Sequence, residues 1–233
     1  MKILALCAFR DAAQYLPEFV GHLRAHVDGI LMINDGSVDS GEVLVSGDPL
    51  VKLGTQLFSG HPQHLHEIKN RKSLLLWALR EGADYVLCLD ADERCEFEFL
   101  KSMRELACWK LSYSLHVRDL WNSEDQYRTD GVWSAKRKEV FFPIYPYWGV
   151  EELHCPWRFV DCPAPTTPTR FHLYHLGSLT PELRKARVDK FHAIDPNHVW
   201  QSDYNYLADE TGLQLEKIPK DRGWNSTTAP PKT

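Results

Sequence analysis

Short apolar runs alternate with longer segments of helical periodicity over residues 1–90. The short runs predict strands at residues 2–8, 29–33, 50–57 and 85–89. Apolar residues spaced three or four apart predict helices over 13–26, 40–46 and 67–80. Strands that alternate with helices pair in parallel through right-handed crossovers, so this half of the chain predicts a mostly parallel sheet covered by helices.

The pattern changes after residue 95. The elements predicted there are a helix, two strands and a final helix, at residues 96–107, 110–117, 170–176 and 181–194. Thr180 is the expected N-cap of the final helix. Tryptophan, proline and tyrosine are frequent between 119 and 165, which predicts loops and antiparallel strands at the edge of the sheet. We therefore expect one α/β domain over residues 1–224 and a flexible tail over 225–233.

Composition narrows the class of protein. The chain has 233 residues, of which 43% are hydrophobic and 25% charged, as in folded globular proteins. Its 27 Lys and Arg against 32 Asp and Glu give a net charge of −5, which argues against a nucleic acid partner. No apolar run approaches the ~20 residues that cross a bilayer, and no N-terminal signal is convincing. We therefore expect a cytoplasmic protein whose six cysteines are reduced.

Acidic residues follow the most apolar of the predicted strands, at 85–89. Asp90, Asp92 and Glu93 would lie at the carboxyl end of that strand, where open α/β sheets bind their ligands. Positions 90 and 92 of an extended chain point the same way, so we expect the two carboxylates to share a Mn²⁺ or Mg²⁺ ion. The alternative is that these acids only favour the start of the next helix.

Two further polar positions would lie near this edge of the sheet. Asp35 follows the strand at 29–33, and its carboxylate suits the N–H of a nucleotide base. Arg71, in the helix before the acidic strand, suits a base or a phosphate. The alternatives are a plain Asx turn at Asp35 and a solvated arginine at position 71.

These motifs stand in an order that resembles glycosyltransferase family 2. The matching stretches are residues 3–9, 12–19, 34–39, 70–71, 89–93 and 175–182. The resemblance implies a GT-A fold, a Rossmann-like three-layer α/β sandwich with a mostly parallel central sheet and a smaller antiparallel acceptor-side region. It also implies inverting transfer from a nucleotide-diphosphate sugar in glycan or polysaccharide synthesis. The chain departs from the family at Asn34, where a second acid is frequent, and at Asn70-Arg71, where the order is often reversed.

Each matching position receives a role from the resemblance. The positions that would contact the nucleotide are Phe9, Arg10, Asp35, Arg71 and Asp90. The positions that would bind Mn²⁺ or Mg²⁺ are Asp90, Asp92 and His175, with Asp92 as the principal ligand. Residues 1–95 would form the nucleotide-sugar-binding half and 96–224 the acceptor-side half. The implied partners are a donor, with a UDP-sugar favoured, and a glycan or lipid-linked acceptor, which leaves peripheral contact with a membrane open.

Inverting transfer also needs a general base that takes the proton of the acceptor hydroxyl. We expect this base to be Glu151 or Glu152, because the aromatic residues around them in 147–154 suit the apolar face of a sugar. Asp130 and Asp125 are the next candidates. The alternative is an aromatic loop that packs on the sheet and carries two solvated acids.

Two groups of side chains allow two interpretations each. Four tryptophans suit either an acceptor cleft or the packing of loops on the sheet, namely Trp121, Trp133, Trp148 and Trp157. Four basic residues of the final helix suit either an anionic ligand or a solvated face, namely Arg184, Lys185, Arg187 and Lys190.

Two other functions remain open at the level of the sequence. A sugar-phosphate nucleotidyltransferase also places Asp and Mg²⁺ at a strand end, but it would normally carry a glycine-rich phosphate loop after the first strand. This chain has Phe9-Arg10-Asp11-Ala12 at that position. The non-enzymatic alternative is a family member that binds nucleotide sugars or glycans without turnover, which the altered Asn34 leaves open.

Overall fold

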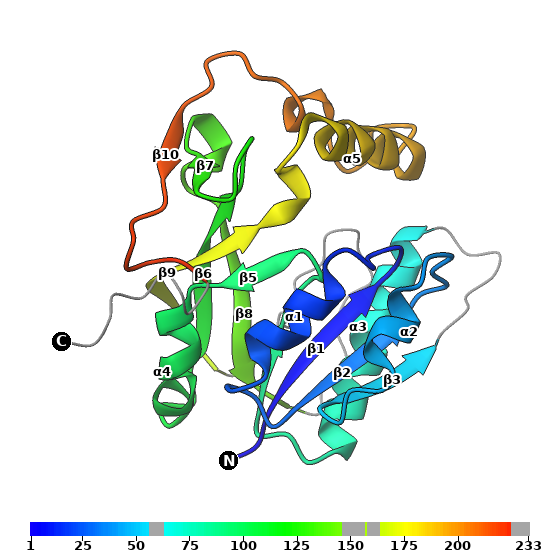
Figure 1. The fold of residues 1–233 in the computed structure, drawn as a ribbon, viewed down its shortest axis with the longest axis vertical. Helices are drawn as coiled ribbons and strands as arrows, with labels where there is room; N and C mark the ends of the chain where they lie inside the picture. The colour runs from blue at the N-terminus through cyan, green and yellow to red at the C-terminus, as the bar shows by residue number, and fades with distance from the viewer. Residues whose placement is uncertain (56–62, 146–156, 158–163, 225–233) are drawn as a thin grey trace.

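The structure is a computed structural model that describes residues 1–55, 63–145, 157 and 164–224 (Figure 1). The strands and α-helices follow in the order β1 (Ile3–Phe9), α1 (Leu16–Leu23), β2 (Gly29–Asn34), α2 (Gly41–Val45), β3 (Val51–Thr55), α3 (Gln63–Arg80), β4 (Tyr85–Cys88), β5 (Glu93–Cys95), α4 (Phe97–Ala107), β6 (Ser112–Asp119), β7 (Gln126–Arg128), β8 (Arg137–Pro143), β9 (Thr166–His175), α5 (Pro181–Ile194) and β10 (Leu215–Lys217). The predicted tail at 225–233 lies outside the described residues.

Eight of these strands form one sheet in the order β3-β2-β1-β4-β8-β6-β9-β5. The strands β3, β2, β1 and β4 are parallel neighbours, and so are β6 and β9. The pairs β4–β8, β8–β6 and β9–β5 are antiparallel, and β7 and β10 form a separate antiparallel sheet. The predicted α/β class, with a mostly parallel central sheet and a smaller antiparallel region, is confirmed.

Helices cover both faces of the parallel strands, which gives three layers. Ile3, Ala5 and Cys7 of β1 belong to a core that also contains buried residues of α1 and α4. Leu4 and Leu6 of the same strand point to the other face and pack in a second core with α3. Figure 1 shows α1 and α3 on opposite sides of β1. Both faces are covered, and this is why β1 and β4 are apolar along nearly their whole length.

The carboxyl ends of β1, β2 and β4 meet at one edge of the sheet. The chain passes from β3, at one end of the sheet, to β4 on the far side of β1, so a topological switch point lies between β1 and β4. Open α/β sheets bind ligands beside such a point. Arg10, Asp35 and Asp90 follow these three strands, so the segments that carry the predicted nucleotide residues share this edge.

Side chains join the loops that follow β1 and β2. Asp11, at φ 50°, donates its backbone N–H to Oγ of Ser37 at 3.0 Å and accepts the Val38 N–H at 2.8 Å. Asp39 accepts the Ala13 N–H at 2.8 Å. These three hydrogen bonds fix the two loops to each other beside the switch point.

The bounds of several elements differ from the prediction. The first helix is limited to Leu16–Leu23, with Pro17 in its first turn, and α3 begins at Gln63, before the predicted residue 67. The strand predicted over 110–117 continues to Asp119, and the last strand of the sheet begins as early as Thr166. The short strands β5, β7 and β10 were not predicted one by one, because three residues are too few to show a periodicity.

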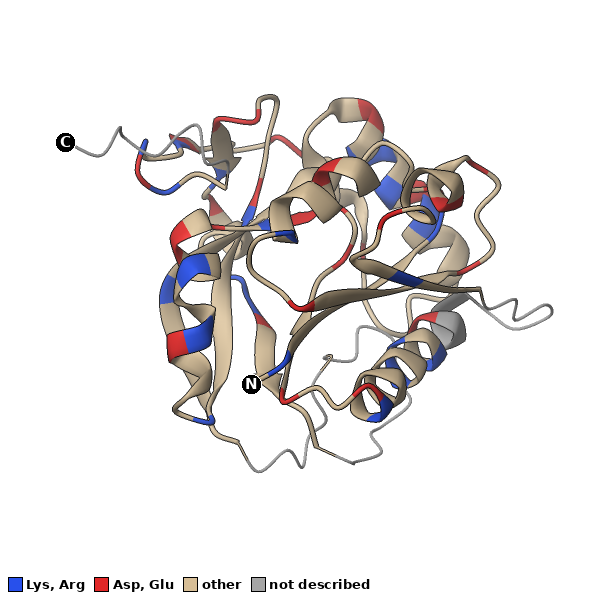
Figure 2. Ribbon diagram, turned by 60° about the horizontal axis from the view of Figure 1, so that its bottom comes forward, with Lys and Arg blue, Asp and Glu red and all other residues tan. Residues whose placement is uncertain are grey.

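Charged side chains of both signs are spread over the surface. Figure 2 shows Lys and Arg interspersed with Asp and Glu over the outer helices. Among the described residues, no helix is both long enough and apolar enough to cross a bilayer.

Candidate active site

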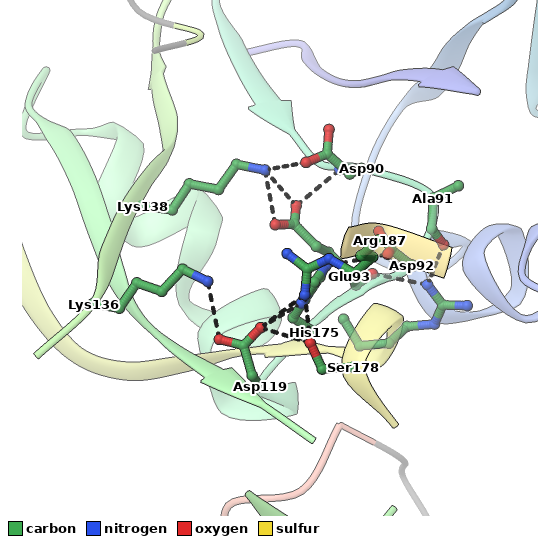
Figure 3. Close-up of polar contacts among 11 residues, drawn as sticks. Asp90, Ala91, Asp92, Glu93, Asp119, Lys136, Lys138, His175, Ser178 and Arg187 are labelled. Carbon is green, nitrogen blue, oxygen red and sulfur yellow. Dashed lines mark hydrogen bonds and ion pairs between the residues drawn. The ribbon is translucent and has the colours of Figure 1, made fainter. Parts of the chain in front are cut away.

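The acidic motif forms a tight turn at the edge of the sheet. β4 ends at Cys88, and the N–H of Glu93 donates to the carbonyl oxygen of Asp90 at 3.0 Å. The chain is therefore not extended between Asp90 and Asp92, and the expectation that alternation points both carboxylates the same way is wrong. The two aspartates enter different polar networks instead (Figure 3).

Asp90 is paired with a lysine from β8. Nζ of Lys138 donates to Oδ2 of Asp90 at 2.6 Å and lies 2.8 and 2.7 Å from the two carboxylate oxygens of Glu93. Burial would raise the pKa of Asp90, but the charges of Lys138 and Arg71 outweigh it and lower that pKa. Burial prevails at Glu93, where the pKa is raised although Lys138 opposes the shift.

Asp92 is paired with His175, and His175 with Asp119. Nε2 of His175 lies 3.1 Å from Oδ2 of Asp92, and Nδ1 lies 2.6 Å from Oδ1 of Asp119 (Figure 3). Burial opposes a positive imidazole, but the charges of Asp92 and Asp119 raise the pKa of His175 to about 9. Burial likewise disfavours the Asp92 carboxylate, and the charge of His175 nevertheless holds its pKa below the ordinary value.

Strand register brings these groups together. Glu93 of β5 and Asp119 of β6 are both register partners of His175, which ends the intervening strand β9. Asp119 has a fully buried side chain, and Nζ of Lys136 lies 3.0 Å from its Oδ2. Arg187 of α5 lies 3.7 Å from Oδ1 of the same carboxylate. An acid, an imidazole and two cations therefore converge from β6, β9, α5 and the segment before β8.

Gly177 is required by the close approach of Asp92 and His175. A Cβ at this position would lie 2.3 Å from Oδ2 of Asp92 and 3.0 Å from Nε2 of His175. Real Cβ atoms do not approach other atoms as closely as 2.3 Å, so a larger residue would displace the carboxylate. The absent side chain leaves room for the two polar groups to face each other.

A buried arginine donates hydrogen bonds to the backbone of the acidic turn at residues 90–93. Arg94 has no exposed surface, and its guanidinium donates to the carbonyl oxygens of Ala91 at 2.9 Å, Glu93 at 2.8 Å and Tyr15 at 2.8 Å. Tyr15 precedes α1, so Arg94 ties the turn that carries Asp92 to the neighbouring helix.

Asp92 and His175 fit a divalent metal ion. Two ligands that each lie about 2.1 Å from one ion at a right angle are about 3 Å apart, close to the separation of Oδ2 and Nε2 here. Asp119 holds the other ring nitrogen, as carboxylates commonly do for metal-binding histidines. Among the described residues, no three His, Cys, Asp or Glu side chains form a group that could hold a metal, so the described part of the chain supplies this pair alone.

The predicted nucleotide residues lie on the neighbouring loops. Phe9 is buried in the core, and its predicted contact with the nucleotide stays a prediction. Asp35 donates its backbone N–H to the carbonyl oxygen of Phe9 at 2.9 Å, and Arg10 is exposed. Asn34 is buried, and its side-chain oxygen accepts the Ser37 N–H at 2.8 Å, so Asn34 rather than Asp35 closes this turn.

Arg71 of α3 is packed rather than solvated. Its guanidinium lies 5.0 Å from the ring centre of Trp157 and pairs with Glu67. Its side chain is 11% exposed, and its charge contributes to the low pKa of Asp90. Arg71 therefore acts electrostatically on the acidic edge, and its predicted contact with a base or phosphate stays a prediction.

The predicted acceptor-side groups have mixed outcomes. Glu151, Glu152 and Trp148 lie outside the described residues. Asp130 accepts two hydrogen bonds of 2.8 Å from Arg128, and Asp125 accepts one of 2.5 Å from Lys217. Both of the other candidates for the base are therefore paired with a cation. The tryptophans Trp121, Trp133 and Trp157 are buried, which confirms the packing interpretation for these three.

The solvated-face interpretation of α5 is wrong for two of its four basic residues. Arg184 is buried 4.0 Å from the ring centre of Trp121 and pairs with Glu210 at 2.8 Å, and Arg187 faces Asp119. Lys185 and Lys190 are exposed, as that interpretation expects. Val188 is one of the buried positions of the same helix.

Sequence reasoning missed three residues of this site: Asp119, Lys136 and Lys138. Asp119 ends a strand in which polar and apolar residues alternate, and an acid at the end of a strand is also the pattern that identified Asp90. The lysines carry no such signal, because their positions depend on the antiparallel pairing of β8 with β4 and β6.

Comparisons with known proteins locate the fold. No protein-family model and no curated protein matches the chain. The crystal structure of S. aureus TarS 1–349 is 14% identical with a TM-score of 0.51, and the match covers 90% of this chain and 70% of that chain. The crystal structure of TarS 1–349 in complex with UDP is also 14% identical, with a TM-score of 0.50 and the same coverage of both chains.

TarS 1–349 in complex with UDP-GlcNAc is 20% identical over 52% of this chain and 35% of that chain, with a TM-score of 0.40. In that match the chain spans about a third of the known protein. At these identities the likeness concerns the fold, and membership of family 2 stays a prediction. The chain has the α/β architecture of TarS, a GT-A-like fold.

Proposed function

We propose that this protein is a metal-dependent inverting glycosyltransferase that moves a sugar from a UDP-sugar to a hydroxyl group of a glycan or lipid-linked acceptor. The observation that supports this function best is the pair formed by Asp92 and His175 over Gly177, at the switch-point edge of the sheet. The TarS crystal structure with UDP, which shares the fold, supports UDP as the nucleotide.

In this proposal Asp92 and His175 hold Mn²⁺ or Mg²⁺. When bound, such an ion offsets the charge that develops on the departing diphosphate. Asp119 fixes the orientation of His175 through Nδ1, so that Nε2 faces Asp92. Arg187 adds a positive charge that acts on Asp92 and would attract the diphosphate.

The nucleotide would lie along the loops that follow β1 and β2. Asp35 would accept a hydrogen bond from the base, and the exposed Arg10 would contact the nucleotide. The hydrogen bonds of Asp11 and Asp39 would hold these loops in place before the donor binds, and this lowers the entropic cost of binding. Glu151 or Glu152 remains our proposed base, since Asp125 and Asp130 are paired with cations.

Calorimetric titration with UDP and UDP-GlcNAc, with and without Mn²⁺, tests this function. We expect binding that depends on Mn²⁺ and that weakens at least about tenfold in Asp92→Asn. Asp125→Asn removes the same charge from an exposed ion pair and should bind as the wild type does. Nucleotide binding that is indifferent both to Mn²⁺ and to Asp92→Asn would contradict the proposal.

The released product distinguishes a glycosyltransferase from a nucleotidyltransferase. A glycosyltransferase releases UDP from UDP-GlcNAc in the presence of acceptor or, slowly, of water. A nucleotidyltransferase would instead release pyrophosphate from UTP and a sugar 1-phosphate. Nucleotide-sugar binding without either product, even when a panel of glycan acceptors is supplied, would favour the non-catalytic alternative.

A further inference from the structure

Lys138 occupies the position next to Asp90 at which a shared metal ion was expected. The register of β4 with β8 pairs Tyr85 with Pro143 and Leu87 with Phe141. Asp90 lies two residues after the end of β4 at Cys88, and Lys138 is the second residue of β8, so the pairing of these two strands brings the segments that carry them close together. The contact between the two side chains therefore depends on the antiparallel pairing of β4 with β8.

The ammonium group of Lys138 is fully used by carboxylates. A lysine has three N–H donors, and Nζ of Lys138 lies within 2.6–2.8 Å of three oxygens, one from Asp90 and two from Glu93. Oε2 of Glu93 also accepts the backbone N–H of Asp90 at 2.8 Å. The side chain of Lys138 is 21% exposed, that of Glu93 4% and that of Asp90 43%, so the contact of Lys138 with Glu93 is shielded from water and Asp90 is partly solvated.

A divalent ion on Oδ2 of Asp90 would compete with this lysine. The ion would lie about 2.1 Å from the oxygen, while Nζ lies 2.6 Å from the same atom. Two cations bound to the same oxygen atom repel each other, and the partial exposure of Asp90 weakens this repulsion without removing it. Asp92 and His175 face each other in a separate network that contains neither Lys138 nor Glu93.

We propose that Lys138 is a positioning residue that neutralises Asp90 and Glu93 and so confines a divalent ion to Asp92 and His175. This inference rests on the proposed function, and it deepens it by dividing the acidic motif into two parts. The ammonium group of Lys138 neutralises Asp90 and Glu93, and the metal ion, which can exchange with solvent, binds to Asp92. The site then depends on Asp92 for metal and on Asp90 only for shape and charge.

Direct titration with Mn²⁺, followed by calorimetry and by the loss of the free Mn²⁺ resonance signal, measures this division. We expect Asp90→Asn to keep Mn²⁺ affinity within about threefold of the wild type, and Asp92→Asn to lose at least about tenfold. Lys138→Met should bind Mn²⁺ about tenfold more tightly, because it frees carboxylates next to Asp92 and removes a positive charge. Lys138→Arg, which keeps the charge, should restore wild-type affinity.

Two controls isolate the effect of Lys138. Lys101→Met removes the same charge from an exposed ion pair on α4, outside the site, so its Mn²⁺ affinity should stay within about threefold of the wild type. Lys138→Met combined with Asp90→Asn should return the affinity toward that of the wild type. If Lys138→Met does not fold, the comparison of Asp90→Asn with Asp92→Asn decides alone.

Equal losses of Mn²⁺ affinity in Asp90→Asn and Asp92→Asn would overturn the inference, because Asp90 would then be a ligand that displaces the lysine. An unchanged affinity in folded Lys138→Met, including no Mn²⁺ binding before or after the change, would overturn it as well. A parallel UDP titration of the wild type reports on the proposed function: absence of UDP binding would refute that function, whichever residues hold Mn²⁺.

Discussion

Asp119 and His175 are register partners on the parallel strands β6 and β9, and the Nδ1 atom of His175 lies 2.6 Å from Oδ1 of Asp119. A carboxylate can only accept, so each ring nitrogen that faces one carries a proton, and a metal ion at Nε2 would replace the proton there and leave the one on Nδ1. The orientation of a candidate metal ligand is thus set by a strand pairing between residues 56 positions apart.

Asp119→Asn tests this orientation. An amide in place of the carboxylate keeps the shape but removes the charge that holds the imidazole, so Mn²⁺-dependent UDP binding should weaken by about 10- to 100-fold. Calorimetry measures the change. Far-ultraviolet circular dichroism should be unchanged, and UDP affinity equal to that of the wild type would show that His175 needs no such partner.

Gly177→Ala tests the closeness of Asp92 and His175. The new Cβ would lie 2.3 Å from Oδ2 of Asp92, so the carboxylate must turn away and Mn²⁺-dependent UDP binding should fall at least about tenfold. Gly21→Ala is a matched control in α1, because a Cβ there meets nothing within 4 Å. That control should bind as the wild type does and gain about 0.5–1 kcal/mol of stability. A Gly177→Ala protein with undiminished binding would remove the geometric basis of the site.

Arg94→Met tests whether the hydrogen bonds of Arg94 stabilise the acidic turn. The change leaves three backbone carbonyl oxygens without their buried donor, so the free energy of unfolding should fall by about 3 kcal/mol. Arg104→Met removes an arginine whose side chain is 50% exposed and should cost less than about 1 kcal/mol. Urea unfolding compares the two, and equal small losses would mean that Arg94 does not hold the turn.

His172 predicts a dependence of stability on pH. Burial, and then the charges of Arg222 and Arg118, lower the pKa of His172 from 6.5 to about 3. The unfolded chain therefore takes up a proton near pH 6.5 that the folded chain refuses until about pH 3, so this residue costs stability as pH falls below 6.5. Between pH 8 and pH 5 the wild type should lose about 2 kcal/mol more than His172→Gln does.

The comparison with His172→Gln cancels the groups that the two proteins share, His175 among them. Urea unfolding at the two pH values measures the free energy of unfolding for each protein. Parallel losses in the wild type and in His172→Gln would show that His172 is not kept neutral by the fold.

The sequence predicted the parallel half of the fold well, for a physical reason. The strands β1, β2 and β4 are covered on both faces, so their apolar runs are long, and turn residues such as Asn34 and Gly82 end the elements locally. Asp35, Asp90 and Asp92 could be found because they stand directly after such runs.

The rest of the site depends on contacts between distant parts of the chain. Lys138 meets Asp90 only because β8 pairs antiparallel with β4, and Asp119 meets His175 only because β6 pairs with β9. Neither pairing leaves a local periodicity that a single sequence reveals. The alternation argument failed at Asp90 and Asp92 for a related reason, since the hydrogen bond from Glu93 to Asp90 folds the segment into a turn.

A crystal structure of the protein with UDP and Mn²⁺, with anomalous data collected for manganese, tests the central claim most directly. We predict one anomalous peak within about 2.3 Å of both Oδ2 of Asp92 and Nε2 of His175, in contact with the diphosphate, while Lys138 keeps its contact with Asp90. A nucleotide bound at this edge with no manganese at Asp92, or with manganese held by other residues, would contradict the account.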